Sequence, residues 1–337
     1  MNTQKNSTLE LLKLFASYMV VFIHVLFYGQ AGIVFDALAR FAVPLFFLIS
    51  GFYSYQITTK KIRKRILNTF ALLIFATLSY TAFNILTYIL NNNAGEIIYY
   101  FRLYKNVDNL VKLLVFNIPI SAFHLWYLYA LLYVYIIFYI LTALRLNERV
   151  IFIISFLLLL LQVLLGEVLS AVGIVLPTPF VRNFVVTGIP FFGMGLIAKK
   201  YEKQLCTVPD SVIVLSAVTG VFAAVFSRYA FGKNELYIGS LFILFSIVCV
   251  FIKYSTVQYP SFITALEGCS TYIYIFHIMI LSVLNKIYAA YAIDINASII
   301  LKNLHPIVVC ISSTLIAHFL TKVFKKARKK KNIAPVS

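Results

Sequence analysis

The sequence predicts an all-α membrane protein, a polytopic bundle of about ten transmembrane helices with both termini in the cytoplasm. Of its 337 residues, 62% are hydrophobic and 12% are charged, whereas a soluble domain carries roughly 25% charged residues. The mean hydropathy is +0.92. Long apolar stretches recur along the chain, and in lipid such stretches must be helical or form a closed barrel to satisfy their backbone polar groups.

Ten apolar segments are each long enough to be a transmembrane helix. They are residues 9–28, 33–58, 66–90, 120–144, 150–171, 183–199, 211–228, 236–252, 262–287 and 303–323. An even number of spans places both termini on one side. Residues 91–119 then form the longest outer connection, and connections of this length are often functional.

The distribution of charge sets the predicted orientation. The net charge is +18, and most of the Lys and Arg residues fall in alternate loops, at residues 60–65, 145–149 and 199–203, and after residue 321. This asymmetry marks the cytoplasmic side, and the same runs would attract anionic lipid. The placement of the basic residues in alternate loops argues against nucleic acid as a partner. The sequence therefore predicts a multi-pass protein of the cell (plasma or inner) membrane, with an integral domain over residues 1–323 and a basic cytoplasmic tail over 324–337; no cleavable signal is evident.

Lys13 and His24 are the first pair of ionisable residues in a predicted span. Eleven residues make three helical turns plus about 20°, so the two side chains share one face about 16 Å apart along the axis. Ionisable groups inside a membrane are costly and indicate function. Histidine is the commonest general base. Glu10, three residues before Lys13, is placed to pair with it, and Arg40 begins the next span on the outer side, where it needs water, a carboxylate or an anionic ligand.

Further polar residues fall in later spans. His124, Trp126 and Tyr127 open the fourth span, either as an aromatic belt at the outer interface or as the wall of an outer-facing pocket. His277 is expected in the outer half of the ninth span. Three histidines on one level could bind zinc, but no spacing supports a metal site, and the four cysteines form no motif. Ser50 beside Gly51 could be a nucleophile, but the pair is more typical of a kink or close packing. Asp36 and Glu167 could orient a histidine, but they are expected as solvated loop ends.

These residues together resemble the motifs of membrane-bound acyltransferase family 3, the bacterial O-acyltransferases of surface glycans. Glu10, Lys13 and His24 resemble the family's opening pattern, although many members have Arg at the position of Lys13. Arg40-Phe-Ala-Val-Pro44-Leu-Phe-Phe-Leu-Ile-Ser50-Gly51-Phe resembles the second-helix signature. Three later segments of this chain resemble later motifs of the family: His124-Leu-Trp126-Tyr-Leu, Pro190-Phe-Phe-Gly-Met-Gly195 and Ser270-Thr-Tyr-Ile-Tyr-Ile-Phe-His277. The segment around Arg182 and Pro190 also weakly echoes the one around Arg40 and Pro44, as an old duplication would.

The resemblance implies transfer of an acyl group, with acetyl favoured, from cytoplasmic acyl-CoA to a hydroxyl of an extracytoplasmic or lipid-linked glycan. No cofactor is expected beyond acyl-CoA as co-substrate. Lys13 and Glu10 would serve the donor, His24 would be the general base, and Arg40 or the His124 segment would stabilise the oxyanion. Ser50, His124, Trp126, Tyr127 and His277 would line the pocket. The alternatives are a transporter or flippase of a lipid-linked saccharide, or a membrane sensor. The acceptor, an acyl-enzyme route and the oligomeric state stay open.

Overall fold

The structure is a computed structural model that describes residues 6–333, with side chains to residue 326; within this range it is helical and contains no β-strand. Between residues 6 and 333, nine helical segments are long and apolar enough to cross a membrane. A tenth apolar helix, α14 (Ile238–Lys253), has 16 residues and is shorter than the others. The predicted all-α bundle of about ten spans is confirmed.

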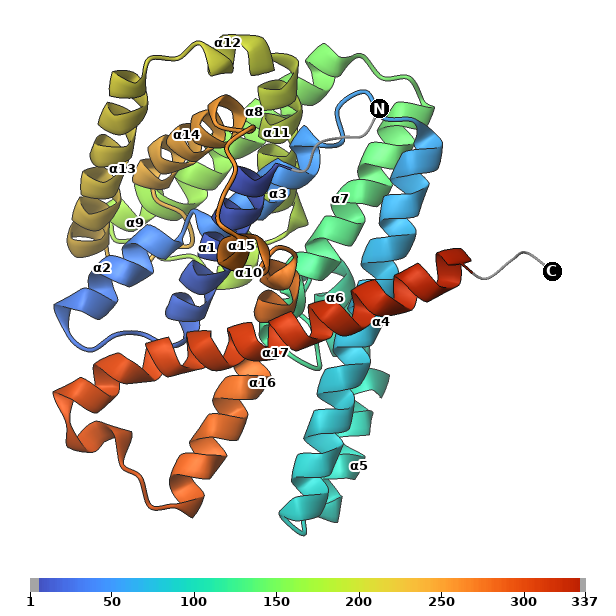
Figure 1. The fold of residues 1–337 in the computed structure, drawn as a ribbon, viewed down its shortest axis with the longest axis vertical. Coiled ribbons are helices and arrows are strands. Elements are labelled where there is room, and N and C mark those ends of the chain that lie inside the picture. The colour runs from blue at the N-terminus through green and yellow to red at the C-terminus, as the bar shows by residue number, and fades with distance from the viewer. Residues whose placement is uncertain (1–5, 334–337) are drawn as a thin grey trace. The chain divides into compact units, whose positions relative to one another are not determined.

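The ribbon in Figure 1 shows the helices with their labels. They divide into two compact units, each assembled from separate stretches of chain. The first, here called the terminal unit, contains Met1–Ala42, Leu205–Val225 and Gly239–Ser337. The second, the central unit, contains Val43–Gln204 and Phe226–Ile238. Both units consist of apolar helices, and the predicted domain limit at residue 323 stays a prediction.

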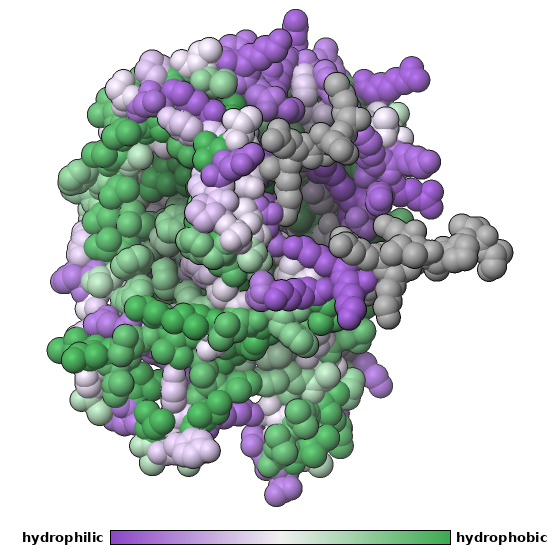
Figure 2. All heavy atoms as spheres, viewed as in Figure 1, coloured by the Kyte–Doolittle hydropathy of each residue, from purple (hydrophilic) through white to green (hydrophobic). Residues whose placement is uncertain are grey.

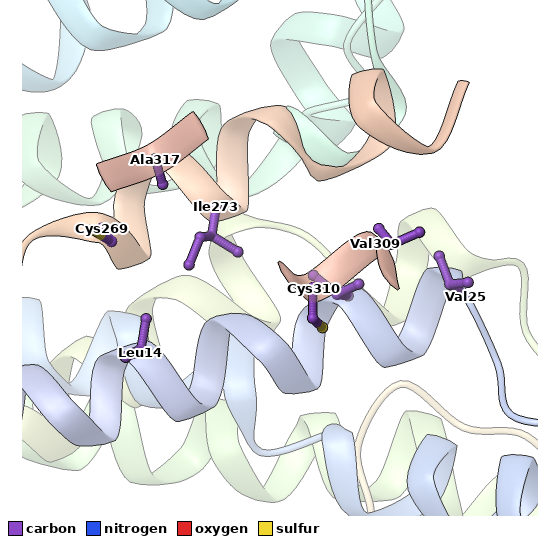
Figure 3. Packing of buried hydrophobic residues seen from close by; sticks show 8 residues of the cluster. Leu14, Val25, Cys269, Ile273, Val309, Cys310 and Ala317 are labelled. Carbon is purple, nitrogen blue, oxygen red and sulfur yellow. The ribbon is translucent and has the colours of Figure 1, made fainter. Parts of the chain in front are cut away.

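The terminal unit is built around α1, α16 and α17. Its helices are α1 (Ser7–His24), α2 (Gln30–Ala39), α13 (Asp210–Phe231, to Val225), α14, the short α15 (Ser261–Thr264), α16 (Cys269–Ala290), η4 (Ile295–Ala297) and α17 (Ile299–Ile333). Leu14, Ile273 and Cys310 belong to a cluster of buried residues from α1, α16 and α17 (Figure 3). Burial of such side chains stabilises a helix bundle by van der Waals packing.

Hydrogen bonds at the start and in the middle of α1 add to this packing. The Asn6 side chain accepts a hydrogen bond from the Leu9 backbone and caps the helix, which satisfies one of the free N–H groups of its first turn. The Tyr18 hydroxyl lies 2.8 Å from Thr314 Oγ1 on α17. The surface of α17 is apolar along most of the helix and hydrophilic toward its C-terminal part (Figure 2). This pattern fits a helix that leaves the membrane at that end.

The central unit contains the remaining helices. They are α3 (Ala42–Phe52, from Val43), α4 (Thr59–Leu90), α5 (Ala94–Lys105), α6 (Val107–Phe116), η1 (Phe123–Leu125), α7 (Trp126–Ala143), α8 (Glu148–Val163), η2 (Leu164–Val168), α9 (Leu169–Ala171), α10 (Thr178–Val181), η3 (Phe184–Gly188), α11 (Ile189–Lys200) and α12 (Glu202–Cys206). The outer connection expected over residues 91–119 contains two helices, α5 and α6, and α5 contacts α4.

The two echoing segments, α3 and α11, are packed against each other through their glycines. A Cβ atom added to Gly51 would lie 1.9 Å from the Phe192 carbonyl oxygen, and one added to Gly195 would lie 2.0 Å from that of Leu48. Small residues permit such close backbone approach between membrane helices. The close-packing interpretation of the pair Ser50–Gly51 therefore fits the structure. At the C-terminal end of α3, Arg65 donates to the carbonyl oxygens of Ser50 (3.3 Å) and Tyr53 (2.6 Å).

The boundaries of several predicted spans differ from those observed. The second is interrupted: α2 ends at Ala39 and α3 begins at Ala42, so Arg40 lies at a break inside Gln30–Phe52 and does not begin the span. The ninth begins at Cys269 and not near Phe262. The last helix continues to Ile333, so the predicted basic tail over 324–337 is helical as far as the structure describes it.

Candidate functional site

The rings of His24 and His277 stack within the terminal unit, with centroids 5.2 Å apart and planes inclined by 29°. His24 is the last residue of α1 and is half-buried, whereas His277 lies in the middle of α16 with no exposed surface. His277 Nδ1 lies 3.1 Å from the Ile273 carbonyl oxygen and 2.8 Å from that of Tyr274. Because a carbonyl oxygen only accepts, Nδ1 bears the proton and Nε2 is the acceptor. His24 and His277, two of the three histidines expected on one level, are thus in contact, and their role in a common site stays a prediction.

Glu10 and Lys13 lie at the other end of the same helix pair. Lys13 Nζ is 2.8 Å from Glu10 Oε1. The second oxygen of Glu10 accepts a hydrogen bond from the Gly268 backbone at 3.1 Å, directly before α16 begins. Glu10 and His24 therefore both contact the segment that carries His277, and α1 and α16 run in the same direction. The expected pairing of Glu10 with Lys13 is observed, and Lys13 keeps a quarter of its side chain exposed.

Arg40 forms a buried ion pair with Asp36. The guanidinium contacts the Asp36 carboxylate, and Nε lies 3.3 Å from the Asp36 carbonyl oxygen. The two residues are 4% and 1% exposed. The expectation of Asp36 as a solvated loop end is therefore wrong. The reason is physical: a guanidinium stays charged in a protein, and a buried charge needs a counter-charge close by. The spacing of four residues on a helix was the available sequence signal.

The remaining predicted pocket residues belong to the central unit. His124 and Trp126 are buried, so they do not form an exposed aromatic belt. His124 Nε2 lies 3.3 Å from the Tyr80 hydroxyl of α4. Tyr127 is packed edge-on to Phe47 with ring centroids 4.8 Å apart. The Ser50 hydroxyl donates to the Phe46 carbonyl oxygen of its own helix (2.8 Å), as expected of a residue with a structural role.

Glu167 is a second carboxylate that is not solvated as expected. It is 5% exposed, lies in the π-helical turn η2, and accepts hydrogen bonds from the Ser227 hydroxyl and the Ile238 backbone N–H. Both donors come from the stretch Phe226–Ile238 of the same unit. The carboxylate thereby satisfies a backbone donor in the first turn of α14, where a negative charge is favourable. A π-helical turn was not foreseeable from apolar periodicity.

Arg182 and Glu235 form an ion pair that sequence reasoning missed. Arg182 follows α10 at an interruption of the span Thr178–Lys200. Its guanidinium lies over the Trp126 ring, 5.4 Å from the centroid, and Nη1 is 3.6 Å from Glu235 Oε1. The echo between the segments around Arg40 and Arg182 was the only signal, and each arginine does lie at a helix break.

The fold and these contacts define a class of protein: a multi-pass helical membrane protein whose first span bears an acid–base pair at one end and a stacked histidine at the other. Within residues 6–333, no three His, Cys, Asp or Glu side chains are grouped as metal ligands would be. The sequence model described as an acyltransferase domain, that of acyltransferase family 3, matches residues 6–322. The chain belongs to this family and is an acyltransferase. No curated protein and no solved structure gives a match.

Proposed function

We propose that the chain transfers an acetyl group from acetyl-CoA, supplied on the cytoplasmic side, to a hydroxyl of an extracytoplasmic or lipid-linked glycan. Family membership supports acyl transfer in general. The observation that carries the proposal is the stacked pair His24–His277, with the charged pair Glu10–Lys13 on the same two helices. A long donor with an anionic nucleotide end and a reactive thioester end matches a cation and an imidazole about 16 Å apart along one helix.

In the proposed reaction His24 is the general base. Its imidazole takes the proton of the acceptor hydroxyl while that oxygen attacks the thioester carbonyl. The tetrahedral intermediate then expels the CoA thiolate, which receives the proton from the imidazolium. The new ester bond replaces the thioester bond, and no oxidant or metal is required.

Other residues take supporting roles in this proposal. Lys13 would bind the phosphate groups of CoA, with Glu10 holding its ammonium group in place. Arg40, oriented by Asp36, would stabilise the oxyanion of the tetrahedral intermediate. His277 is a positioning residue, since its ring is packed against that of His24 and its own orientation is set by hydrogen bonds to backbone carbonyl oxygens.

Replacement of His24 tests the proposal. His24→Ala should lower acyl transfer about 10²–10⁴-fold, the usual contribution of a general base, while the protein still inserts and accumulates. The matched control is His305→Ala on α17, whose ring faces Tyr288 at 5.5 Å and has no role in the reaction.

The readout is mass spectrometry of surface glycans from cells with the gene, without it, and with each variant. Loss of one ester mass in the deletion, its return with His305→Ala and its absence with His24→Ala would support the proposal and name both acyl group and acceptor. Near wild-type acylation in His24→Ala would contradict the assignment of the base.

A further inference from the structure

Within the part of the chain that the structure describes, Arg182 leaves most of its hydrogen-bonding capacity unused. A guanidinium has five donors and is not deprotonated in proteins. Among the side chains described, those of residues 6–326, Arg182 contacts the face of Trp126 and the carboxylate of Glu235 at 3.6 Å, a distance that exceeds the N–H···O distance of a hydrogen bond. The Arg182 and Glu235 side chains keep 29% and 22% of their surface exposed. Ionisable groups within a membrane span are retained where they serve a function.

The backbone around Arg182 is held in place by two asparagines. The Asn183 side chain accepts hydrogen bonds from the backbones of Val185 (2.8 Å) and Val186 (3.1 Å) and donates to the Pro179 carbonyl oxygen (2.8 Å). Asn117 accepts from the Phe184 backbone at 3.0 Å. The backbone between α10 and η3 is therefore held in one conformation by hydrogen bonds, and this fixes the backbone position of Arg182.

The charges of the pair restrict which ligand fits. An anion would be attracted by Arg182 but repelled by Glu235, and a cation would meet the opposite conflict. A neutral group with neighbouring donor and acceptor atoms can bind to both side chains, because a carboxylate accepts several hydrogen bonds and one hydroxyl of the group can donate to it while the next accepts from the guanidinium. Adjacent hydroxyls on a sugar ring have this arrangement.

We propose that Arg182 and Glu235, with Trp126 as the support of the guanidinium, form a binding site for the adjacent hydroxyls of a neutral saccharide. The bound saccharide would be the acceptor of the acyl group, and this part of the inference rests on the proposed function. It concerns residues of the central unit alone and assigns them no part in the chemical step.

Trp126 supplies a direct readout, because it is the only tryptophan in the chain. A ligand that draws the guanidinium away from the indole face should change the tryptophan emission. The full chain in detergent is titrated with methyl α-D-glucopyranoside, sodium glucuronate or inorganic phosphate. We expect a saturable change with the neutral glycoside at lower concentration than with either anion.

Substitutions then separate the contributions of the two charges. Arg182→Gln should weaken binding of the glycoside about tenfold or more, as loss of hydrogen bonds to a charged group does. Glu235→Gln leaves an unopposed positive charge and should reverse the preference toward glucuronate. Arg102→Gln, which removes an exposed guanidinium from α5, is the matched control and should bind the glycoside as the wild type does. Arg182→Lys serves if Arg182→Gln fails to fold; it should also bind the glycoside less tightly.

Three outcomes would overturn the proposal: no saturable change with the glycoside, an equal response in the wild type and the Arg182 variants, or tighter binding of phosphate or glucuronate than of the glycoside to the wild type. Acetyl-CoA hydrolysis without an acceptor is measured in the same preparations. Hydrolysis that persists while saccharide binding is absent contradicts the saccharide site alone. Saccharide binding without any thioester hydrolysis contradicts the proposed function.

Discussion

The imidazole of His277 has one orientation and one tautomer in this structure. Its Nδ1 proton is committed to the carbonyl oxygens of Ile273 and Tyr274, and its ring is stacked on that of His24. A general base must be held within hydrogen-bond reach of its substrate. A neighbouring ring with a fixed orientation restricts the rotation of His24, which ends its helix and would otherwise have more freedom.

Lys13 is the residue whose substitution tests donor binding. Lys13→Gln removes the charge proposed to hold the CoA phosphates and should raise the apparent KM for acyl-CoA about 10–100-fold, the usual effect of losing a charge-assisted hydrogen bond. Lys13→Arg keeps the charge and adds the bidentate fork, so it should stay active. Steady-state kinetics with varied acyl-CoA give the answer. An unchanged donor KM in Lys13→Gln would rule out this role.

The ion pair Asp36–Arg40 has a structural and a proposed catalytic part, and two variants separate them. Asp36→Ala removes the carboxylate that pairs with the buried Arg40 and should lower the free energy of unfolding by about 3–5 kcal/mol. The double variant Asp36→Leu with Arg40→Met replaces both charges by apolar groups and should be nearly as stable as the wild type. Unfolding in detergent is followed by circular dichroism, and acyl transfer is assayed alongside. Full activity in the stable double variant would exclude Arg40 from the reaction.

For individual residues, the sequence shows which side chains are ionisable but not which partners they contact. Glu10 and Lys13 are three residues apart, so their pairing follows from helix geometry. The pairing of Arg182 with Glu235 joins residues distant in sequence and depends on tertiary packing, which no local pattern contains. The ninth span was expected from residue 262, whereas Gly268, with a φ of +87°, directly precedes the start of α16 at Cys269.

Among the helices, α3 and α11 show how little space some contacts leave. Gly51→Ala and Gly195→Ala would each place a methyl group about 2 Å from a backbone oxygen of the facing helix. Overpacking of this kind costs about 1–3 kcal/mol or more, so both variants should melt at lower temperature in detergent. Gly166→Ala is the control, because nothing lies within 4 Å of its Cβ position. Equal melting temperatures for all three variants would show that α3 and α11 do not pack in this way.

Apolar length predicts where helices cross the membrane but not where they are interrupted. The second, fifth and sixth spans contain breaks or π-helical turns, and Arg40, Glu167 and Arg182 lie at them. A polar side chain at an interruption is buried among neighbours that satisfy it. Because hydropathy is averaged over a window of residues, a single polar residue at a break changes it little, and each span is predicted as one continuous helix.

For the whole molecule, the charge asymmetry predicts that both termini are cytoplasmic and that residues 91–93 are outside. A reporter that fluoresces only in the cytoplasm and a phosphatase active only outside, fused after Ser337 or inserted at Asn92, should report opposite sides. The positive-inside rule gives this expectation. The same side for both positions would overturn the orientation, and with it the proposed cytoplasmic entry of the donor.

The reciprocal glycine contacts between α3 and α11 have a consequence for biosynthesis. About 140 residues separate Gly51 from Phe192, which at 5–20 residues per second corresponds to about 7–28 s of translation. During this interval α3 is already in the membrane, and its glycine face is covered by lipid or by the insertion machinery. If translation stalls before α11 is made, the membrane contains an insertion intermediate in which the glycine face of α3 lacks its partner helix. We expect membrane chaperones and quality-control proteases to recognise such an intermediate.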